Sequence, residues 1–285
     1  MTDRALAFWA CLAATALPGP SAAASPCGAT DFLAMPLTPP AAAPGLDAVA
    51  AALTLAYPDL VVSPDGTAWA VGGGPWRPLG TVDAGPPEAT VAAPEVADQF
   101  RWTYPLDLDP QARLAPWTDP GRPRNSELFA ALWFEAEDAA RASLVPVEAP
   151  APAGARFMVT RKRGVDCQLR AALEALAAEG DPAVAAAFRA PGGGFNWRRI
   201  AGTSRLSAHS YGIAVDINPE LGGYWRWSGA AEGAVGPWES RVPDAVIRQM
   251  ERFGFIWGGK WHHYDGMHFE YRPELILHAR LLGAA

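Results

Sequence analysis

The decisive stretch of this sequence is Ser207-Ala208-His209-Ser210-Tyr211-Gly212-Ile213-Ala214-Val215-Asp216, which is followed further along by Asp265-Gly266-Met267-His268-Phe269-Glu270. Together the two stretches hold two histidines and an aspartate, His209, His268 and Asp216. Two imidazoles and one carboxylate leave the fourth position of a tetrahedral zinc ion open for water. Asp265 would then lie beside that water as the base. The sequence therefore predicts a mononuclear zinc site of the catalytic type.

Alternation of side chains predicts that these residues lie on two strands. In 213–218 large apolar residues alternate with Ala214, Asp216 and Asn218. Asp216 therefore lies on the face opposite the packed apolar one. In 267–271 the same alternation places His268 and Glu270 on one face. Each strand thus buries one face and presents candidate metal-site residues on the other, with Glu270 suited to orienting a ligand.

Asp265 needs a separate argument. It lies an odd number of residues from His268 and would face away from it in a regular strand. A glycine within a strand pattern often marks a bend. We therefore expect Gly266 to turn Asp265 back toward the site.

All five histidines of the chain lie at or after residue 209. They are His209, His262, His263, His268 and His278. Such clustering favours a local role for them over scattered positions in a core.

The two stretches resemble the motifs of zinc D-Ala-D-Ala carboxypeptidases and L-alanyl-D-glutamate endopeptidases, which cut peptidoglycan stem peptides and share a fold with hedgehog signalling domains. The patterns S-x-H-x-x-G-x-A-x-D and D-x-x-H-F-E are both complete, and 196–206 and 255–261 resemble one bacterial branch of this family. The resemblance covers about residues 155–275. It implies that His209, Asp216 and His268 bind one zinc ion and that Asp265 is the general base.

The resemblance also implies an α+β fold, in which an antiparallel sheet with flanking helices carries the mononuclear zinc site. Members of the family place an arginine before the first histidine, for the substrate carbonyl or carboxylate. We expect Arg198 in this role, with Arg205 second, although a structural ion pair explains Arg198 and Arg199 equally well. Further residues expected at the substrate or around the ligands are Ser207, His263 and Glu270.

Other hydrolase classes fit the sequence poorly. The H-E-x-x-H zinc motif is absent, and neither Lys162 nor Lys260 follows a serine by three residues, as serine-type D,D-peptidases require. Ser207, His209 and Asp216 lie too close along one extended segment to form a catalytic triad. The remaining alternative is a zinc-containing protein that binds cell wall or peptide without turnover, against which the intact Asp265 counts.

The N-terminus predicts export. Arg4 precedes an apolar run over residues 5–17, and small residues at 22–24 complete the pattern of a secretory signal peptide spanning residues 1–24. An uncleaved anchor is the alternative. The pattern favours a soluble secreted protein, in the periplasm of a bacterium, with no stable membrane insertion. Cys27 and Cys167 then either form a disulfide or stay free, and the cysteine at 27 lacks the pattern of a lipoprotein cleavage site.

Composition agrees with a globular enzyme, since half of the residues are hydrophobic and the formal net charge is -7. The acidic balance argues against nucleic acid as a partner and favours recognition of a stem peptide in a cleft over coating of an anionic polymer. The sequence does not indicate an oligomeric state.

The chain is expected to divide into an N-terminal accessory region, 25–150, of undefined role and a peptidase domain, 151–285. The first should contain a hairpin of 60–62 and 68–71 and a helix over 126–142. In the second, helices over 165–178 and 243–253 should cover one face of the sheet.

Overall fold

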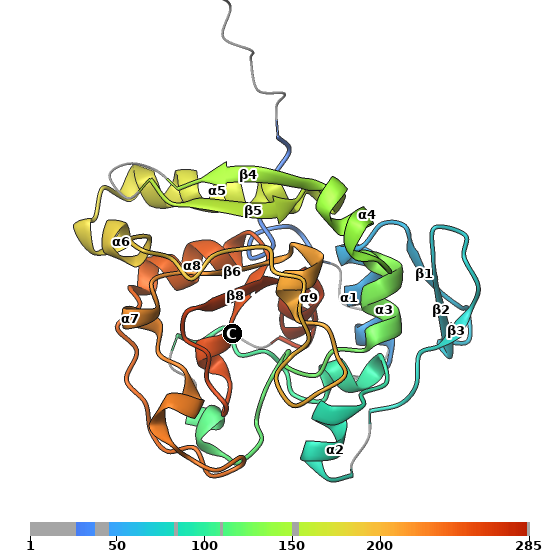
Figure 1. Ribbon diagram of the computed structural model, residues 1–285. Coiled ribbons are helices and arrows are strands. Elements are labelled where there is room, and N and C mark those ends of the chain that lie inside the picture. The colour runs from blue at the N-terminus through green and yellow to red at the C-terminus, as the bar shows by residue number, and fades with distance from the viewer. Residues whose placement is uncertain (1–26, 38–45, 83–84, 109–110, 150–153, 284–285) are drawn as a thin grey trace, which may run out of the picture.

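The computed structural model describes residues 27–37, 46–82, 85–108, 111–149 and 154–283, so the predicted signal peptide at 1–24 lies outside the described residues. The predicted α+β class is confirmed, with helices set around small antiparallel sheets (Figure 1). The helices are α1 (Leu46–Ala56), α2 (Pro87–Ala92), α3 (Ser126–Leu132), α4 (Glu137–Ala142), α5 (Val165–Glu179), α6 (Pro182–Ala187), α7 (Pro219–Gly222), α8 (Asp244–Arg252) and α9 (Pro273–Leu281). The strands are β1 (Leu60–Val62), β2 (Ala68–Val71), β3 (Arg77–Pro78), β4 (Leu144–Glu148), β5 (Arg156–Thr160), β6 (Ala214–Asp216), β7 (Phe255–Trp257) and β8 (His268–Tyr271).

The sheet that carries the candidate site has the order β6-β8-β7 and is antiparallel throughout. Its register sets Asp216 opposite His268, so the two faces that the alternation assigned to site residues coincide. Val215, Phe269 and Trp257 form the next row across the sheet and are all buried. The predicted division into a packed face and a site face is therefore confirmed for this sheet.

The two predicted helices of the C-terminal part are present as α5 and α8. Helix α8 begins after Pro243, buries Val246, Ile247 and Met250, and ends before Gly254, which has a φ of 91°. It packs directly on β7, whereas α5 packs on α8 and on the β4–β5 hairpin. The expectation that both helices cover one sheet is thus modified, because the β4–β5 pair provides a second sheet for α5.

The single helix expected over 126–142 is wrong, because the structure divides it into α3 and α4. Trp133 leaves the helical conformation with φ −111° and ψ −89° and is almost fully buried. Lys162 Nζ donates to the carbonyl of Trp133, and Arg163 Nε donates to the carbonyl of Leu132 at 3.0 Å. Cations at the last carbonyls stabilise a helix end, and these contacts end α3 where periodicity alone would continue it.

The predicted hairpin of β1 and β2 is confirmed, with Gly66 in its turn at a φ of 73°. With β3 it forms a peripheral sheet beside α1 (Figure 1). Helix α1 packs along α9, and one hydrophobic core includes buried residues from Phe32 to Leu281. The N-terminal region therefore shares its core with the segment that carries the candidate site, and β4 pairs with β5 across residue 150.

A disulfide joins Cys27 to Cys167, which is the first of the two alternatives that the sequence left open. Disulfides persist in oxidising compartments, so this bond indicates an extracytoplasmic location. In the part of the chain that the structure describes, no helix has the length and apolar character needed to cross a membrane.

Candidate metal centre

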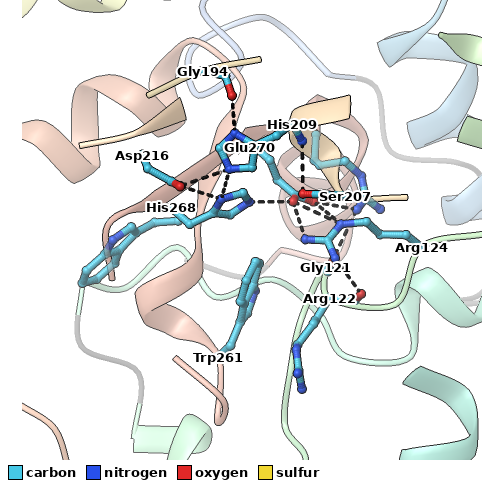
Figure 2. Close-up of polar contacts among 12 residues, drawn as sticks. Gly121, Arg122, Arg124, Gly194, Ser207, His209, Asp216, Trp261, His268 and Glu270 are labelled. Atoms are coloured by element: carbon cyan, nitrogen blue, oxygen red, sulfur yellow. Dashed lines mark hydrogen bonds and ion pairs between the residues drawn. The ribbon is translucent and has the colours of Figure 1, made fainter. Parts of the chain in front are cut away.

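Three side chains from two strands and one short helix meet at a single point (Figure 2). His209 lies on a 3₁₀ helix, Ala208–Tyr211, just before β6, and Asp216 and His268 are paired residues of β6 and β8. Oδ1 of Asp216 lies 3.2 Å from Nε2 of His209 and 3.0 Å from Nδ1 of His268, and the two ring nitrogens are 3.2 Å apart. The three ligand atoms predicted from the sequence thus form a near-equilateral triangle.

The size of this triangle suits a zinc ion. Bonds of about 2.0–2.1 Å to tetrahedral zinc place neighbouring ligand atoms about 3.3 Å apart. The edges of 3.0–3.2 Å are close to that spacing. The donor set and its spacing therefore fit a metal ion held by three protein ligands with further coordination positions open.

Backbone contacts fix the ring of His209. Its Nδ1 lies 2.6 Å from the carbonyl oxygen of Gly194, which accepts its hydrogen and leaves Nε2 for the metal (Figure 2). Position 194 has little room for a side chain, because a Cβ there would lie 2.6 Å from the carbonyl oxygen of Met158. Glycine at this position lets the loop lie against β5 while its carbonyl reaches the histidine.

The ring of His268 is fixed by a carboxylate. Nε2 of His268 donates to Oε2 of Glu270 at 2.9 Å, so Nδ1 faces the other two ligand atoms. Glu270 is fully buried and also contacts Arg124 and Arg272. Such a carboxylate–histidine contact sets the tautomer and raises the basicity of a metal ligand. The proposed orienting role of Glu270 agrees with this geometry.

The charges at the site favour a cation. Burial opposes ionisation of Asp216, but the adjacent His209 and His268 hold its pKa well below the usual range. Burial likewise disfavours a charged His268, yet its hydrogen bonds to Asp216 and Glu270 raise its pKa to about 10. In the metal-free protein His268 is therefore protonated at neutral pH, and a metal ion must displace that proton to bind.

Asp265 lies in a turn just before β8, where the charges of His268 and Asp216 act on its carboxyl. The backbone N–H of His268 donates to the carbonyl of Asp265 at 3.1 Å, and a Cβ on Gly266 would lie 1.9 Å from the carbonyl oxygen of Gly222. Oδ1 of Asp265 is buried and has no hydrogen-bond partner among the described residues. Burial raises the pKa of Asp265 to about 6; His268 opposes this effect and the Asp216 carboxylate adds to it.

The two arginines expected near the substrate differ in their surroundings. The side chain of Arg198 is exposed, and its backbone N–H donates to Oγ of Ser210. Arg205 is half-buried, and its Nε and Nη1 are buried without a hydrogen-bond partner in the described part of the chain. Burial, with the charges of Arg124 and Arg122, lowers the pKa of Arg205 to about 10, so it stays charged at neutral pH. Arg205 is therefore the better placed of the two to meet an anionic group.

Ser207 and His263 have structural contacts. Oγ of Ser207 accepts from the backbone N–H of His209 at 3.4 Å and caps the short helix that carries this histidine. His263 is buried; its Nδ1 lies 2.6 Å from Oδ2 of Asp119, and its Nε2 accepts from the N–H of Gly233. Both ring nitrogens of His263 are thus engaged, which leaves neither for a substrate.

Sequence reasoning missed the contributions of the N-terminal region. Arg124, Asp119 and the carbonyl of Gly121 reach Glu270, His263 and Arg272, respectively. Their sequence separations from these partners are 146, 144 and 151 residues. The only local signal is the charged, proline- and glycine-containing run Asp119-Pro120-Gly121-Arg122-Pro123-Arg124, which is also typical of a surface turn.

Comparison with known protein families supports the assignment of a peptidase-like site to this segment. Residues 201–271 match the family described as D-alanyl-D-alanine carboxypeptidase. This range contains the three ligand residues, Asp265 and Glu270, and it confirms the resemblance drawn from the two motifs. This segment is thus similar to a family of peptidases. Among curated proteins and solved structures, none matches the chain.

Proposed function

We propose that the protein is a zinc-dependent peptidase that removes the terminal D-alanine from peptidoglycan stem peptides in the bacterial periplasm. The observation that carries the proposal is the meeting of His209, Asp216 and His268, with ligand atoms 3.0–3.2 Å apart, inside the segment that matches the carboxypeptidase family. The unpaired carboxylate oxygen of Asp265 supports turnover over binding alone. The Cys27–Cys167 disulfide supports the compartment.

The proposed chemistry is hydrolysis by an activated water. Held by the three ligands, zinc would polarise the scissile carbonyl and lower the pKa of water from about 15.7 to about 7. Asp265 takes the proton of the attacking water and passes it to the leaving amine. Its raised pKa, about 6, suits this exchange because the carboxyl can both accept and release a proton near neutral pH.

Arg205 is the proposed partner of the substrate's anionic group. Its Nε and Nη1 lack partners among the described residues, and burial strengthens a charge-assisted hydrogen bond to a carboxylate. Capture of the terminal carboxylate distinguishes a carboxypeptidase from an endopeptidase, whose substrate continues past the scissile bond. Arg198, which is exposed, is the weaker candidate.

Mass spectrometry of stem peptides tests the proposal. A pentapeptide ending in D-Ala-D-Ala is incubated with the disulfide-intact protein, with chelator, and with chelator followed by added zinc. Loss of one alanine residue that stops with chelator and returns with zinc is the expected result. Release of internal fragments would assign an endopeptidase instead. Zinc binding with no cleavage of any stem peptide would support the alternative, a zinc-containing binding protein.

A further inference from the structure

The carboxylate of Glu270 is the link between the metal centre and the N-terminal region. It lies on β8 with no exposed surface, and Oε2 accepts the Nε2 hydrogen of His268 at 2.9 Å. On its other side it is held by two guanidiniums, those of Arg124, which is labelled in Figure 2, and of Arg272. Because the ring of His268 turns with this hydrogen bond, whatever holds Glu270 also sets the direction of the ligand nitrogen.

Arg124 holds Glu270 by both carboxylate oxygens. Its Nε lies 3.0 Å from Oε1 and 3.1 Å from Oε2, and its Nη2 also donates to Oε2. The remaining terminal nitrogen, Nη1, donates to the carbonyl of Arg122 at 3.3 Å. The guanidinium lies over the ring of Trp261, with its carbon 5.6 Å from the ring centroid. These contacts therefore fix the orientation of the Arg124 guanidinium as well as placing its charge beside Glu270.

The two guanidiniums at Glu270 have different tasks. Arg272 divides its contacts between Glu270, Glu274, the side chain of Gln99 and the carbonyl of Gly121, and it follows β8 directly. Arg124 directs Nε and Nη2 at Glu270 alone, and it comes from a different part of the chain, outside residues 201–271. Arg272 connects the carboxylate to a wider buried network, whereas Arg124 clamps it.

The segment that carries Arg124 is anchored on both sides, to the C-terminal part before Arg124 and to the N-terminal region after it. Before it, the carbonyl of Thr118 accepts from the N–H of His262 at 2.8 Å, and the carbonyl of Pro120 accepts from Nε1 of Trp261 at 2.6 Å. After it, Asn125 caps α3 by accepting from the N–H of Leu128 at 2.9 Å. These contacts leave little freedom for the backbone at residue 124, so its side chain is presented to Glu270 in one place.

We propose that Arg124 is a positioning residue of the metal centre: it fixes the carboxylate of Glu270, which in turn fixes the ring of His268 with Nδ1 toward the metal. This inference rests on the proposed zinc site. It gives the N-terminal region a role, because that region supplies a part of the centre that residues 201–271 lack. Lysine cannot replace the arginine fully, because an ammonium group is a point charge without the planar fork that grips both oxygens.

Zinc affinity tests the proposal without relying on peptide cleavage. Zinc affinity is measured in competition with a chromophoric chelator. The visible spectrum is recorded separately with cobalt in place of zinc. Both measurements are made on the whole wild-type chain, R124K, R124Q, E270Q and the double variant R124Q/E270Q. Loss of a partner behind a metal ligand weakens binding by about 10–100-fold. R124Q should show a loss of about ten-fold and an altered cobalt spectrum, with R124K in between.

The double variant separates positioning from general destabilisation. If Arg124 acts through Glu270, then R124Q should change zinc affinity less than about three-fold once Glu270 is already Gln. R163Q is the matched control: Arg163 is bidentate to Asp59 with a side chain 12% exposed, close to the 10% of Arg124, and its contacts are not with the ligands. It should unfold at a lower temperature and keep its zinc affinity and cobalt spectrum.

Each result bears on one claim. Wild-type affinity in R124Q, or an equal loss from R124Q with and without Glu270, would overturn the role of Arg124. Should R124Q not fold, R124K with a wild-type cobalt spectrum and affinity would overturn it as well. A wild-type chain that binds zinc but cuts no stem peptide would refute the proposed function and leave this inference standing, and a wild-type chain that binds no zinc would refute both.

Discussion

Arg205 combines a cost to the fold with a proposed role in substrate binding, and its replacement by methionine should separate the two. The guanidinium is half-buried, and burial, with the charges of Arg124 and Arg122, lowers its pKa to about 10. A shift of that size corresponds to at most about 3 kcal/mol against the charged form. Solvent screening at a half-buried group reduces this to about 1 kcal/mol. R205M, which keeps the length and removes the charge, should therefore raise the free energy of unfolding by about 1 kcal/mol.

Activity should move in the opposite direction. A charge-assisted hydrogen bond to a carboxylate contributes about 1.5–3 kcal/mol, so kcat/KM for a stem pentapeptide should fall by about 10–150-fold in R205M. The same peptide with an amidated C-terminus lacks the carboxylate. It should be a poor substrate for the wild type by a similar factor, and R205M should treat the two peptides almost alike.

The assay pairs urea unfolding with cleavage of the free and amidated peptides. R199Q is the control from the same loop, since Arg199 is exposed and donates to the carbonyl of Ser204. It should keep both activity and peptide preference. If R205M lost stability, or kept the wild-type preference for the free carboxylate, Arg205 would be a structural residue and the argument from its unpaired nitrogens would be wrong.

Three further predictions concern other groups. Asp265→Asn should lower kcat by about 10²–10⁴-fold and retain zinc affinity. In the wild type, kcat should fall as the pH drops through a midpoint no higher than about 6, because burial raises the pKa of Asp265 to about that value. A pH profile of kcat that is the same in the variant as in the wild type would contradict the role of Asp265 as the base. Burial lowers the pKa of His278 from 6.5 to about 4, so the unfolded chain binds this proton first on acidification and the fold loses up to about 3 kcal/mol between pH 6.5 and about 4. His278→Phe should flatten that loss in urea unfolding at each pH, and an unchanged slope would assign it to other groups. Reduction of the Cys27–Cys167 disulfide, which spans a sequence separation of 140, should lower the free energy of unfolding by about 5 kcal/mol on the loop-entropy estimate. Thermal unfolding with and without reductant measures this loss. Coincident unfolding curves would show that the bond does not stabilise the fold.

The ligand set could be predicted because its determinants are local. His209 and Asp216 belong to one motif, His268 and Glu270 to another, and strand alternation alone shows that each pair can face one side. The pairing of β6 with β8, which alternation does not give, sets Asp216 opposite His268 and puts both on the site face. Helix α8 was equally visible, with proline before it and glycine after it.

The break between α3 and α4 could not be predicted from the same signals. The apolar spacing of 126–142 continues past Trp133, and no proline or glycine interrupts it. The helix ends because Lys162 and Arg163, some thirty residues later, take the carbonyls at its last turn, at separations of 29 and 31 residues. Tertiary contacts decide such a boundary, whereas periodicity reports only which face is apolar.

The same distinction separates the ligands of the metal centre from their supports. A ligand must be of one residue type at one place, so its motif is visible in the sequence; a support needs only to present a donor or acceptor at the right point, and any segment that passes by can supply it. Gly194 supplies a backbone carbonyl to His209, and this contact requires of residue 194 only that it be small. Arg124 supplies a guanidinium to Glu270 from a run that resembles a surface turn. The motifs therefore identify the candidate ligands, while the contacts that hold these ligands in place come in part from a region outside the motifs.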